Sequence, residues 1–133
     1  STPQEFYGEV RMIDHFGIKV KNLEASKLFY QKTLAPLGYK IAFDISQAVS
    51  FAEPRNADPT GDFWLNVGQQ EPEHFAFSAQ NEEEVEAFYQ AALAAGGKDN
   101  GAPGERSQYH PGYYAAYIID PDGNNVEVVC HKE

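Results

Sequence analysis

Hydrophobic and polar residues change their spacing in the same order twice along this chain. The segment MIDHFGIKV alternates, with His15, Gly17 and Lys19 on one side, as expected for a strand. Helical spacing follows in both halves, with apolar stripes at Leu28, Phe29 and Leu34 and at Val85, Phe88, Tyr89 and Leu93. We therefore expect each half to begin with a strand followed by a helix.

Residues with known preferences for helix ends stand at the borders of both helical stretches. Asn22 and Asn81 are candidate N-caps, because a side-chain oxygen can accept a hydrogen bond from a free N–H of the first turn. Pro36 and Gly38 are expected to end the first helix, and Gly96-Gly97 to end the second.

Short strand-like segments follow each helix. The first half continues with YKIAF, AVSFAE and DFWLNV, and PRNADPTG forms a turn or loop between the last two. In the second half KDNGAPGERSQYHPG is long and rich in glycine, so we expect a loop with at most one short strand. YYAAYIID and NNVEVVC flank DPDGN, which is a hairpin signal because Asp-Gly tolerates positive φ angles. Each half is thus approximately β-α-β-β-β.

The two halves also match residue by residue when the stretches beginning at His15 and His74 are laid together without gaps. The matches include unrelated residue types: Phe16 with Phe75, Asn22 with Asn81, Glu24 with Glu83, Phe29-Tyr30-Gln31 with Phe88-Tyr89-Gln90, and Gly38 with Gly97. Shared amphipathicity does not explain such matches. We interpret them as an internal duplication with a period too long for a solenoid.

MIDHFGIKVKNLEASKLFYQKTLAPLGY, EHFAFSA and the ending YYAAYIIDPDGNNVEVV resemble the vicinal oxygen chelate superfamily. This superfamily includes glyoxalase I, extradiol dioxygenases, fosfomycin-resistance enzymes and bleomycin-resistance proteins. The resemblance implies an α+β fold in which two βαβββ modules form a curled mixed sheet, an open cup around a metal or ligand. We expect one domain over residues 1–133, with modules near residues 10–69 and 70–131.

His15, His74 and Glu127 are the candidate metal ligands. The two histidines are equivalent in the repeat, and Glu127 lies in an apolar strand where an unpaired carboxylate is costly to bury. Two imidazoles and a carboxylate suit a divalent ion such as Zn, Ni, Mn or Fe, with positions left for substrate. Two hydrogen-bonded core histidines and a glutamate at the rim would explain the same residues. The resemblance implies the metal, because its ligands match these three positions.

Glyoxalase I-like members take a fourth ligand, usually Glu, from the last strand of the first module. In this chain Trp64 or Asn66 occupies that place; tryptophan cannot ligate and asparagine is a weak donor. The missing acid argues against efficient glyoxalase I chemistry. The remaining triad is closer to the open site of non-haem Fe(II) oxygenases.

Other residues are candidates for contacts with a substrate. His110 lies beside Pro-Gly and could act as an acid or base with Tyr113, although a loop histidine is ordinarily solvated. Phe51, Trp64 and Tyr114 would be aromatic walls, and Arg106 could grip a carboxylate or only balance Glu105. His131 shares its strand side with Glu127, but a chain end usually frays.

Composition narrows the class of partner. The chain has 133 residues, of which 42% are hydrophobic, which is enough to bury a core, and no stretch is long enough to cross a membrane. A net charge of -10 disfavours nucleic acid. The single cysteine, Cys130, suits a reducing compartment, and we expect a cytoplasmic protein. By resemblance we expect a homodimer acting on a small molecule.

Two functions of different class remain, beside a third alternative, a degenerate family member that binds a metabolite without turnover. The first is a metal-dependent enzyme whose ion binds vicinal oxygens of a small substrate, with lyase, isomerase or dioxygenase chemistry. The second is a metal-free protein of the bleomycin-resistance type that sequesters a cationic drug, which an acidic surface would suit. Two matched histidines and a late glutamate favour the enzyme.

Overall fold

The computed structural model describes residues 16–54, 61–69 and 72–132. In the first half the elements are β1 (Phe16–Val20), α1 (Leu23–Leu34), the 3-10 turn η2 (Ala35–Leu37), β2 (Lys40–Ile45), β3 (Ala48–Ala52) and β4 (Phe63–Val67). In the second half they are β5 (His74–Ser78), α2 (Glu82–Ala94), β6 (Lys98–Glu105), β7 (Tyr113–Ile119) and β8 (Asn125–His131). The expected loop over PRNADPTG falls mostly on residues 55–60, which lie outside the described residues.

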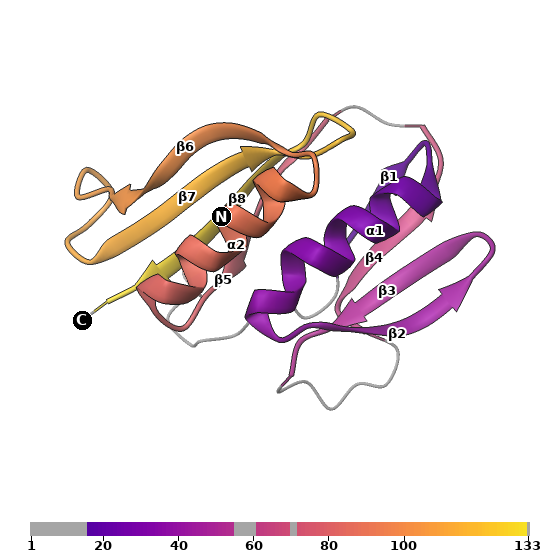
Figure 1. The fold of residues 1–133 in the computed structure, drawn as a ribbon, viewed down its shortest axis with the longest axis horizontal. Helices are drawn as coiled ribbons and strands as arrows, with labels where there is room; N and C mark the ends of the chain where they lie inside the picture. Colours follow the sequence, from indigo (N-terminus) through magenta and orange to yellow (C-terminus); the bar gives the residue numbers. More distant parts are fainter. Residues whose placement is uncertain (1–15, 55–60, 70–71, 133) are drawn as a thin grey trace.

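Each half forms a four-stranded mixed sheet, with strand order β1-β4-β3-β2 in one and β5-β8-β7-β6 in the other. The first and last strands of each half are parallel neighbours, and the remaining pairs are antiparallel. The two helices lie next to each other on one side of the sheets, and the sheets do not close on each other (Figure 1). The expected α+β fold of two βαβββ modules is confirmed.

The helix borders follow the expected capping chemistry. The side chain of Asn22 accepts from the N–H of Ala25 at 3.0 Å, and Asn81 accepts from Glu84 at 2.8 Å. Gly38, with φ of 86°, provides the left-handed residue that ends the 3-10 turn after α1.

One expectation about local structure was wrong, and another was incomplete. Leu28, expected on the buried face of α1, is 48% exposed. The fully buried Tyr30 lies on that face instead. The glycine-rich stretch after α2 contains one strand, as expected, but β6 has eight residues rather than a few and takes up the first half of the stretch. β6 tolerates its glycines and Pro103 because it is an edge strand whose pairing with β7 is interrupted by two register shifts.

An aromatic core lies between the helices and the sheets and joins the two modules. Phe16 on β1 and Phe75 on β5, which are equivalent in the repeat, have ring centroids 5.2 Å apart. Phe63 on β4 meets Phe77 on β5 edge to face at 5.1 Å. The helix-facing residues of both sheets are therefore used in packing, which leaves the opposite faces for chemistry.

The DPDGN turn between β7 and β8 also joins the modules. The buried carboxylate of Asp120 accepts from the backbone N–H groups of Asp122 and Asn124, each at 2.9 Å. It also accepts a hydrogen bond from the hydroxyl of Tyr30 on α1. Ser26 on the same helix donates to Asp122 at 2.9 Å. The turn thus fixes the late hairpin against the first helix.

Candidate metal centre

His74 begins β5 on the sheet face that points away from α2. Its Nδ1 lies 3.2 Å from the backbone oxygen of Asn125 on the neighbouring β8. A carbonyl oxygen can only accept, so this contact is a hydrogen bond when Nδ1 carries the proton. The Nε2 atom then presents an unshared electron pair. A backbone carbonyl that holds the second nitrogen in this way is typical of metal-binding histidines.

Glu127 lies on the same face of β8 and is only 5% exposed. Its Oε2 accepts a hydrogen bond from the hydroxyl of Tyr113 and a longer one, at 3.4 Å, from Tyr117. Burial, and then the neighbouring carboxylate, raise the pKa of both tyrosines, so both keep their protons and donate. Because both phenols engage Oε2, Oε1 is directed elsewhere.

Oε1 of Glu127 faces Nε2 of His74 across 3.6 Å. This separation is too long for a hydrogen bond, and both atoms are electron-pair donors in the arrangement just described. Two such donors, each about 2.1 Å from one ion, would lie about 3.0–3.4 Å apart for angles between a right angle and the tetrahedral value. The observed 3.6 Å is slightly longer than this range, so a small approach of the two side chains would let them share a divalent ion.

His15 lies outside the described residues. Among residues 16–54, 61–69 and 72–132, no group of three His, Cys, Asp or Glu side chains converges. His74 and Glu127 are thus the two described members of the expected triad.

The strand registers identify the position in the first module that corresponds to Glu127. Phe16 pairs with Phe63, and Gly17 with Trp64; in the second module Phe75 pairs with Val126, and Ala76 with Glu127. Phe16 and Phe75 are equivalent in the repeat, so Trp64 is the counterpart of Glu127. Of the two residues considered from the sequence, Trp64 rather than Asn66 stands where the acid would be.

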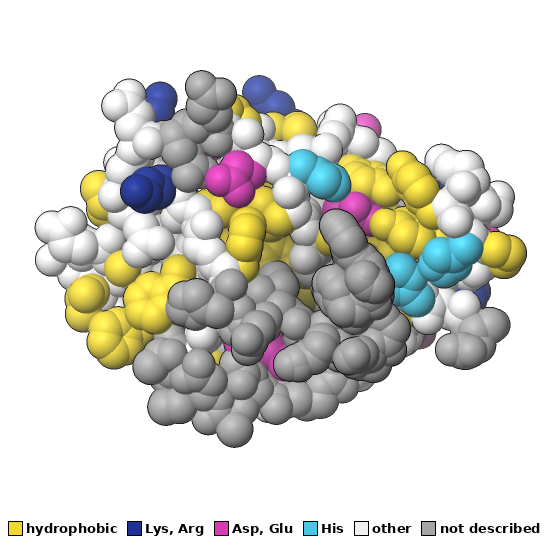
Figure 2. Space-filling model, turned by 180° about the vertical axis from the view of Figure 1, so that it is seen from behind, with side chains coloured by type: hydrophobic (Ala, Val, Ile, Leu, Met, Phe, Trp, Pro, Cys, Tyr) yellow, Lys and Arg dark blue, Asp and Glu magenta, His cyan; other side chains and the backbone are white. Residues whose placement is uncertain are grey.

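Two more histidines lie beside Tyr113 on the same face. His110 and His131 approach each other with Nε2 and Nδ1 3.0 Å apart, and both rings contact the ring of Tyr113. Figure 2, seen from the side without helices, shows histidine side chains around a carboxylate and hydrophobic groups. His131 was not among the expected site residues, although its alternation with Glu127 on β8 was a signal for it.

The remaining candidates divide between the two faces of the sheets. Arg106 lies over the ring of Tyr117 at 5.4 Å and donates to the backbone oxygen of Ala102 at 2.8 Å, near the Glu127 cluster. Phe51 is 1% exposed and belongs to the aromatic core. Tyr114 faces α2, where its hydroxyl donates to Glu86 at 2.7 Å, a bond that raises its pKa to about 12. Phe51 and Tyr114 are therefore apart from His74 and Glu127.

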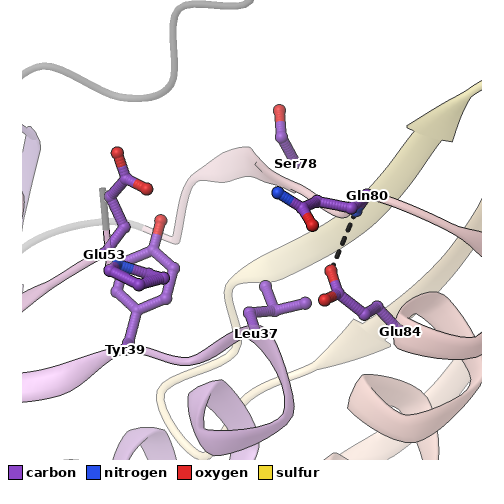
Figure 3. Close-up of a pocket in the computed structure, with 7 residues that line it drawn as sticks. Leu37, Tyr39, Glu53, Ser78, Gln80 and Glu84 are labelled. Carbon is purple, nitrogen blue, oxygen red and sulfur yellow. Dashed lines mark hydrogen bonds between the residues drawn. The ribbon is translucent and has the colours of Figure 1, made fainter. Parts of the chain in front are cut away.

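Two cavities open elsewhere on the described surface. One of about 260 Å³ lies between the modules and is lined by residues that include Tyr39, Glu53 and Glu84. Figure 3 shows Glu84 directed to the backbone N–H of Gln80, a contact of 2.9 Å that caps α2. The other, of about 440 Å³, includes the Lys27–Asp44 ion pair. Three of their charged groups, Glu84, Lys27 and Asp44, already make contacts within the fold.

Solved structures with the same fold cover most of this chain. A glyoxalase/bleomycin resistance protein from Albidiferax ferrireducens T118 is 28% identical, with a TM-score of 0.75, over 90% of this chain and 98% of that one. Lactoylglutathione lyase from Agrobacterium tumefaciens is 21% identical, with a TM-score of 0.65, over 87% of this chain and 91% of that one. The fosfomycin resistance protein FosX from Listeria monocytogenes, in complex with Mn(II) and sulfate, is 21% identical, with a TM-score of 0.65, over 89% and 88%.

No curated protein matches the sequence significantly. Neither helix in the described ranges has the length and hydropathy that crossing a membrane requires. A family profile does match, over residues 12–128, which is most of the chain. Together with the two modules and their topology, this match shows that the chain belongs to the Glyoxalase/Bleomycin resistance protein/Dioxygenase superfamily.

Proposed function

We propose that this protein is a metal-dependent enzyme in which His15, His74 and Glu127 hold a divalent ion that binds vicinal oxygens of a small substrate. The observation that carries this proposal is the pair of facing donors, Nε2 of His74 and Oε1 of Glu127, 3.6 Å apart. Each has its other polar atom occupied, by the carbonyl of Asn125 and by the hydroxyl of Tyr113. A buried carboxylate in this state is stabilised by a cation.

The chain's own residues would prepare this site before substrate arrives. Asn125 fixes the ring of His74, and Tyr113 and Tyr117 hold the carboxylate of Glu127, so neither ligand has to reorganise. When bound, the ion would act as a Lewis acid that stabilises an oxyanion on the substrate. Trp64 and Tyr117 would give apolar walls, and Arg106 over Tyr117 would be available to an anionic group of the substrate.

Because Trp64 replaces the fourth, acidic ligand of glyoxalase I-like members, we favour an ion with three protein ligands and more open positions. The FosX structures carry Mn(II), which is consistent with a superfamily scaffold that accepts hard ions. We therefore favour Mn(II) or Fe(II) and a substrate with two adjacent oxygens, in lyase, isomerase or ring-opening oxygenation chemistry.

Titration of the metal-free, untagged protein with Mn(II), Fe(II), Ni(II) and Zn(II) tests the proposal. We expect one site per chain whose affinity falls by at least tenfold in His74→Ala and in Glu127→Gln. His110→Ala, which removes a histidine from the same face outside the ligand set, serves as the matched control and should keep the wild-type affinity. If none of the four ions binds, the proposed metal-dependent activity is excluded, and a metal-free protein that sequesters a small molecule is the better hypothesis.

We also propose a homodimer in a reducing compartment such as the cytoplasm. Phe43 and Ile45 on the edge strand β2 are 42% and 51% exposed, and hydrophobic side chains also gather at the β2–β3 end of the face without helices (Figure 2). Cys130 is buried and is the only cysteine of the chain, which suits a compartment without disulfides. The molar mass in solution, measured by light scattering for wild type and Phe43→Ser, tests the dimer.

A further inference from the structure

His110 and His131, the histidine pair, contact each other through defined ring atoms. Nε2 of His110 lies 3.0 Å from Nδ1 of His131, with the geometry of a hydrogen bond. The second nitrogen of His110, Nδ1, lies 2.7 Å from the backbone oxygen of Pro111. Three of the four nitrogens of the histidine pair are thus accounted for by these two contacts.

These contacts determine where the protons of the neutral pair lie. The oxygen of Pro111 can only accept, so Nδ1 of His110 carries a proton. Nε2 of neutral His110 then has none and accepts, so the proton of the pair contact belongs to Nδ1 of His131. Nε2 of His131 is left unprotonated. Partial desolvation, and secondarily His110, lower the pKa of His131, which favours its neutral form.

The backbone holds the histidine pair together at the end of the chain. Gly112, with φ of 87°, lies so near β8 that a Cβ on it would be 2.2 Å from the backbone oxygen of Lys132. The N–H of Lys132 donates to the oxygen of Gly112 at 2.7 Å, and the N–H of Gly112 donates to Glu105 at 3.0 Å. The segment around Lys132, expected from the sequence to fray, is instead held by these hydrogen bonds. They bring His131 next to His110.

Tyr113 connects the histidine pair to the candidate metal centre. Its ring centroid lies 5.2 Å from that of His110 and 5.1 Å from that of His131, and its hydroxyl donates to Glu127. His131 and Glu127 share one side of β8, and Tyr113 is the cross-strand partner of His131. A small molecule on this face would contact both the ligand Glu127 and the neighbouring imidazoles.

We propose that His131 is the proton acceptor of this site, acting through Nε2, and that His110 is its positioning residue. This inference rests on the proposed function, because the proton comes from the small molecule bound beside Glu127. The proton moves from a carbon or oxygen of that molecule to Nε2, and the electron pair of the broken bond stays on the molecule. The imidazolium that forms keeps its Nδ1–H directed to His110, as the orienting partner in a catalytic triad holds its histidine.

Nitrogen-15 NMR of the imidazoles tests the tautomers directly. In the wild-type protein we expect Nδ1–H on both His110 and His131. His110→Ala should abolish the fixed tautomer of His131, and His110→Gln, whose amide oxygen can accept in place of Nε2, should restore it. A proton on Nε2 of His131 in the neutral wild type would overturn the proposal. His74→Ala should keep Nδ1–H on both histidines, because their tautomers do not depend on bound metal. This measurement therefore tests the histidine pair separately from the metal site.

Carbethoxylation by diethyl pyrocarbonate tests whether the free nitrogen is reactive. The reagent acylates an unprotonated imidazole nitrogen, with loss of ethyl carbonate, and peptide mapping locates the product. We expect His131 to be modified and His110 to be protected in the wild type, and His110 to react several-fold faster in His131→Ala. Equal rates for His110 in both proteins would overturn the proposal. Metal affinity should be unchanged in His131→Ala, since His131 is not a ligand.

Discussion

Trp64 and Glu127 occupy corresponding positions in the two sheets. Trp64 on β4 pairs with Gly17 on β1, and Glu127 on β8 pairs with Ala76 on β5, the position equivalent to Gly17 in the repeat. One is a donor-only indole and the other a carboxylate. The duplicated scaffold thus carries a carboxylate at this position in one sheet and an indole in the other. The asymmetry limits the number of carboxylates that can reach an ion from these two positions to one.

Restoring an acid at position 64 should strengthen metal binding. Trp64→Glu places a second carboxylate at the position equivalent to Glu127, and we expect the Mn(II) affinity to rise by at least about tenfold, equivalent to about 1.4 kcal/mol. Isothermal titration with Mn(II) measures it. Trp64→Gln, which makes the same change in size without the charge, is the control. If Trp64→Glu bound Mn(II) no more tightly than Trp64→Gln, the ion would not lie within reach of residue 64.

Removing the hydroxyl of Tyr113 should weaken metal binding without unfolding the protein. Tyr113→Phe deletes the donor that holds Oε2 of Glu127, and loss of such a supporting bond typically lowers metal affinity by about 10–100-fold. Tyr114→Phe is the matched control, because its hydroxyl meets Glu86 on the other face of the same strand. Equal affinities in the two variants would show that Tyr113 does not orient the ligand.

The bond between Tyr30 and Asp120 should contribute to stability across the modules. Tyr30→Phe leaves the buried carboxylate of Asp120 without one of its donors, which should lower the free energy of unfolding by about 1–3 kcal/mol. Urea denaturation measures the loss. Tyr89→Phe removes a comparable hydroxyl from Asp99, in a more exposed place, and should cost less. A smaller effect at Tyr30 than at Tyr89 would contradict this role for the turn.

Gly112→Ala should separate the end of β8 from the loop before β7. The added Cβ meets the backbone oxygen of Lys132, so we expect both lower stability and loss of the fixed tautomer of His131. Gly96→Ala carries the same penalty of a positive φ, here 105°, but its Cβ meets nothing within 4 Å. The difference between the variants isolates the clash. An unchanged His131 tautomer in Gly112→Ala would show that the approach of the two segments does not build the histidine pair.

The sequence was most informative where local chemistry determines structure. The repeat beginning at His15 and His74, the caps Asn22 and Asn81 and the DPDGN turn were enough to predict two βαβββ modules, and the structure has them. These features depend on short-range contacts and periodicity, which are readable along the chain. Alternation along β8 also placed Glu127 and His131 on one side.

Features that depend on tertiary contacts were not readable in this way. Leu28 fits a helical stripe, yet only the position of the second module determines that Tyr30 faces inward to Asp120. Phe51 was a plausible pocket wall, but the register of β3 directs it into the core. The pairing of His110 with His131 requires the approach of Gly112 to Lys132, which nothing local in either segment indicates.

The metal content of the purified, untagged protein tests the central claim most directly. Mass spectrometry of wild type beside His74→Ala should find about one divalent ion per chain in the wild type, and little or none in the variant. The element found would also decide between oxygenation and lyase assays. A wild type without metal, both as purified and after reconstitution with Mn(II), Fe(II), Ni(II) and Zn(II), would contradict the account and leave a metal-free binding protein in its place.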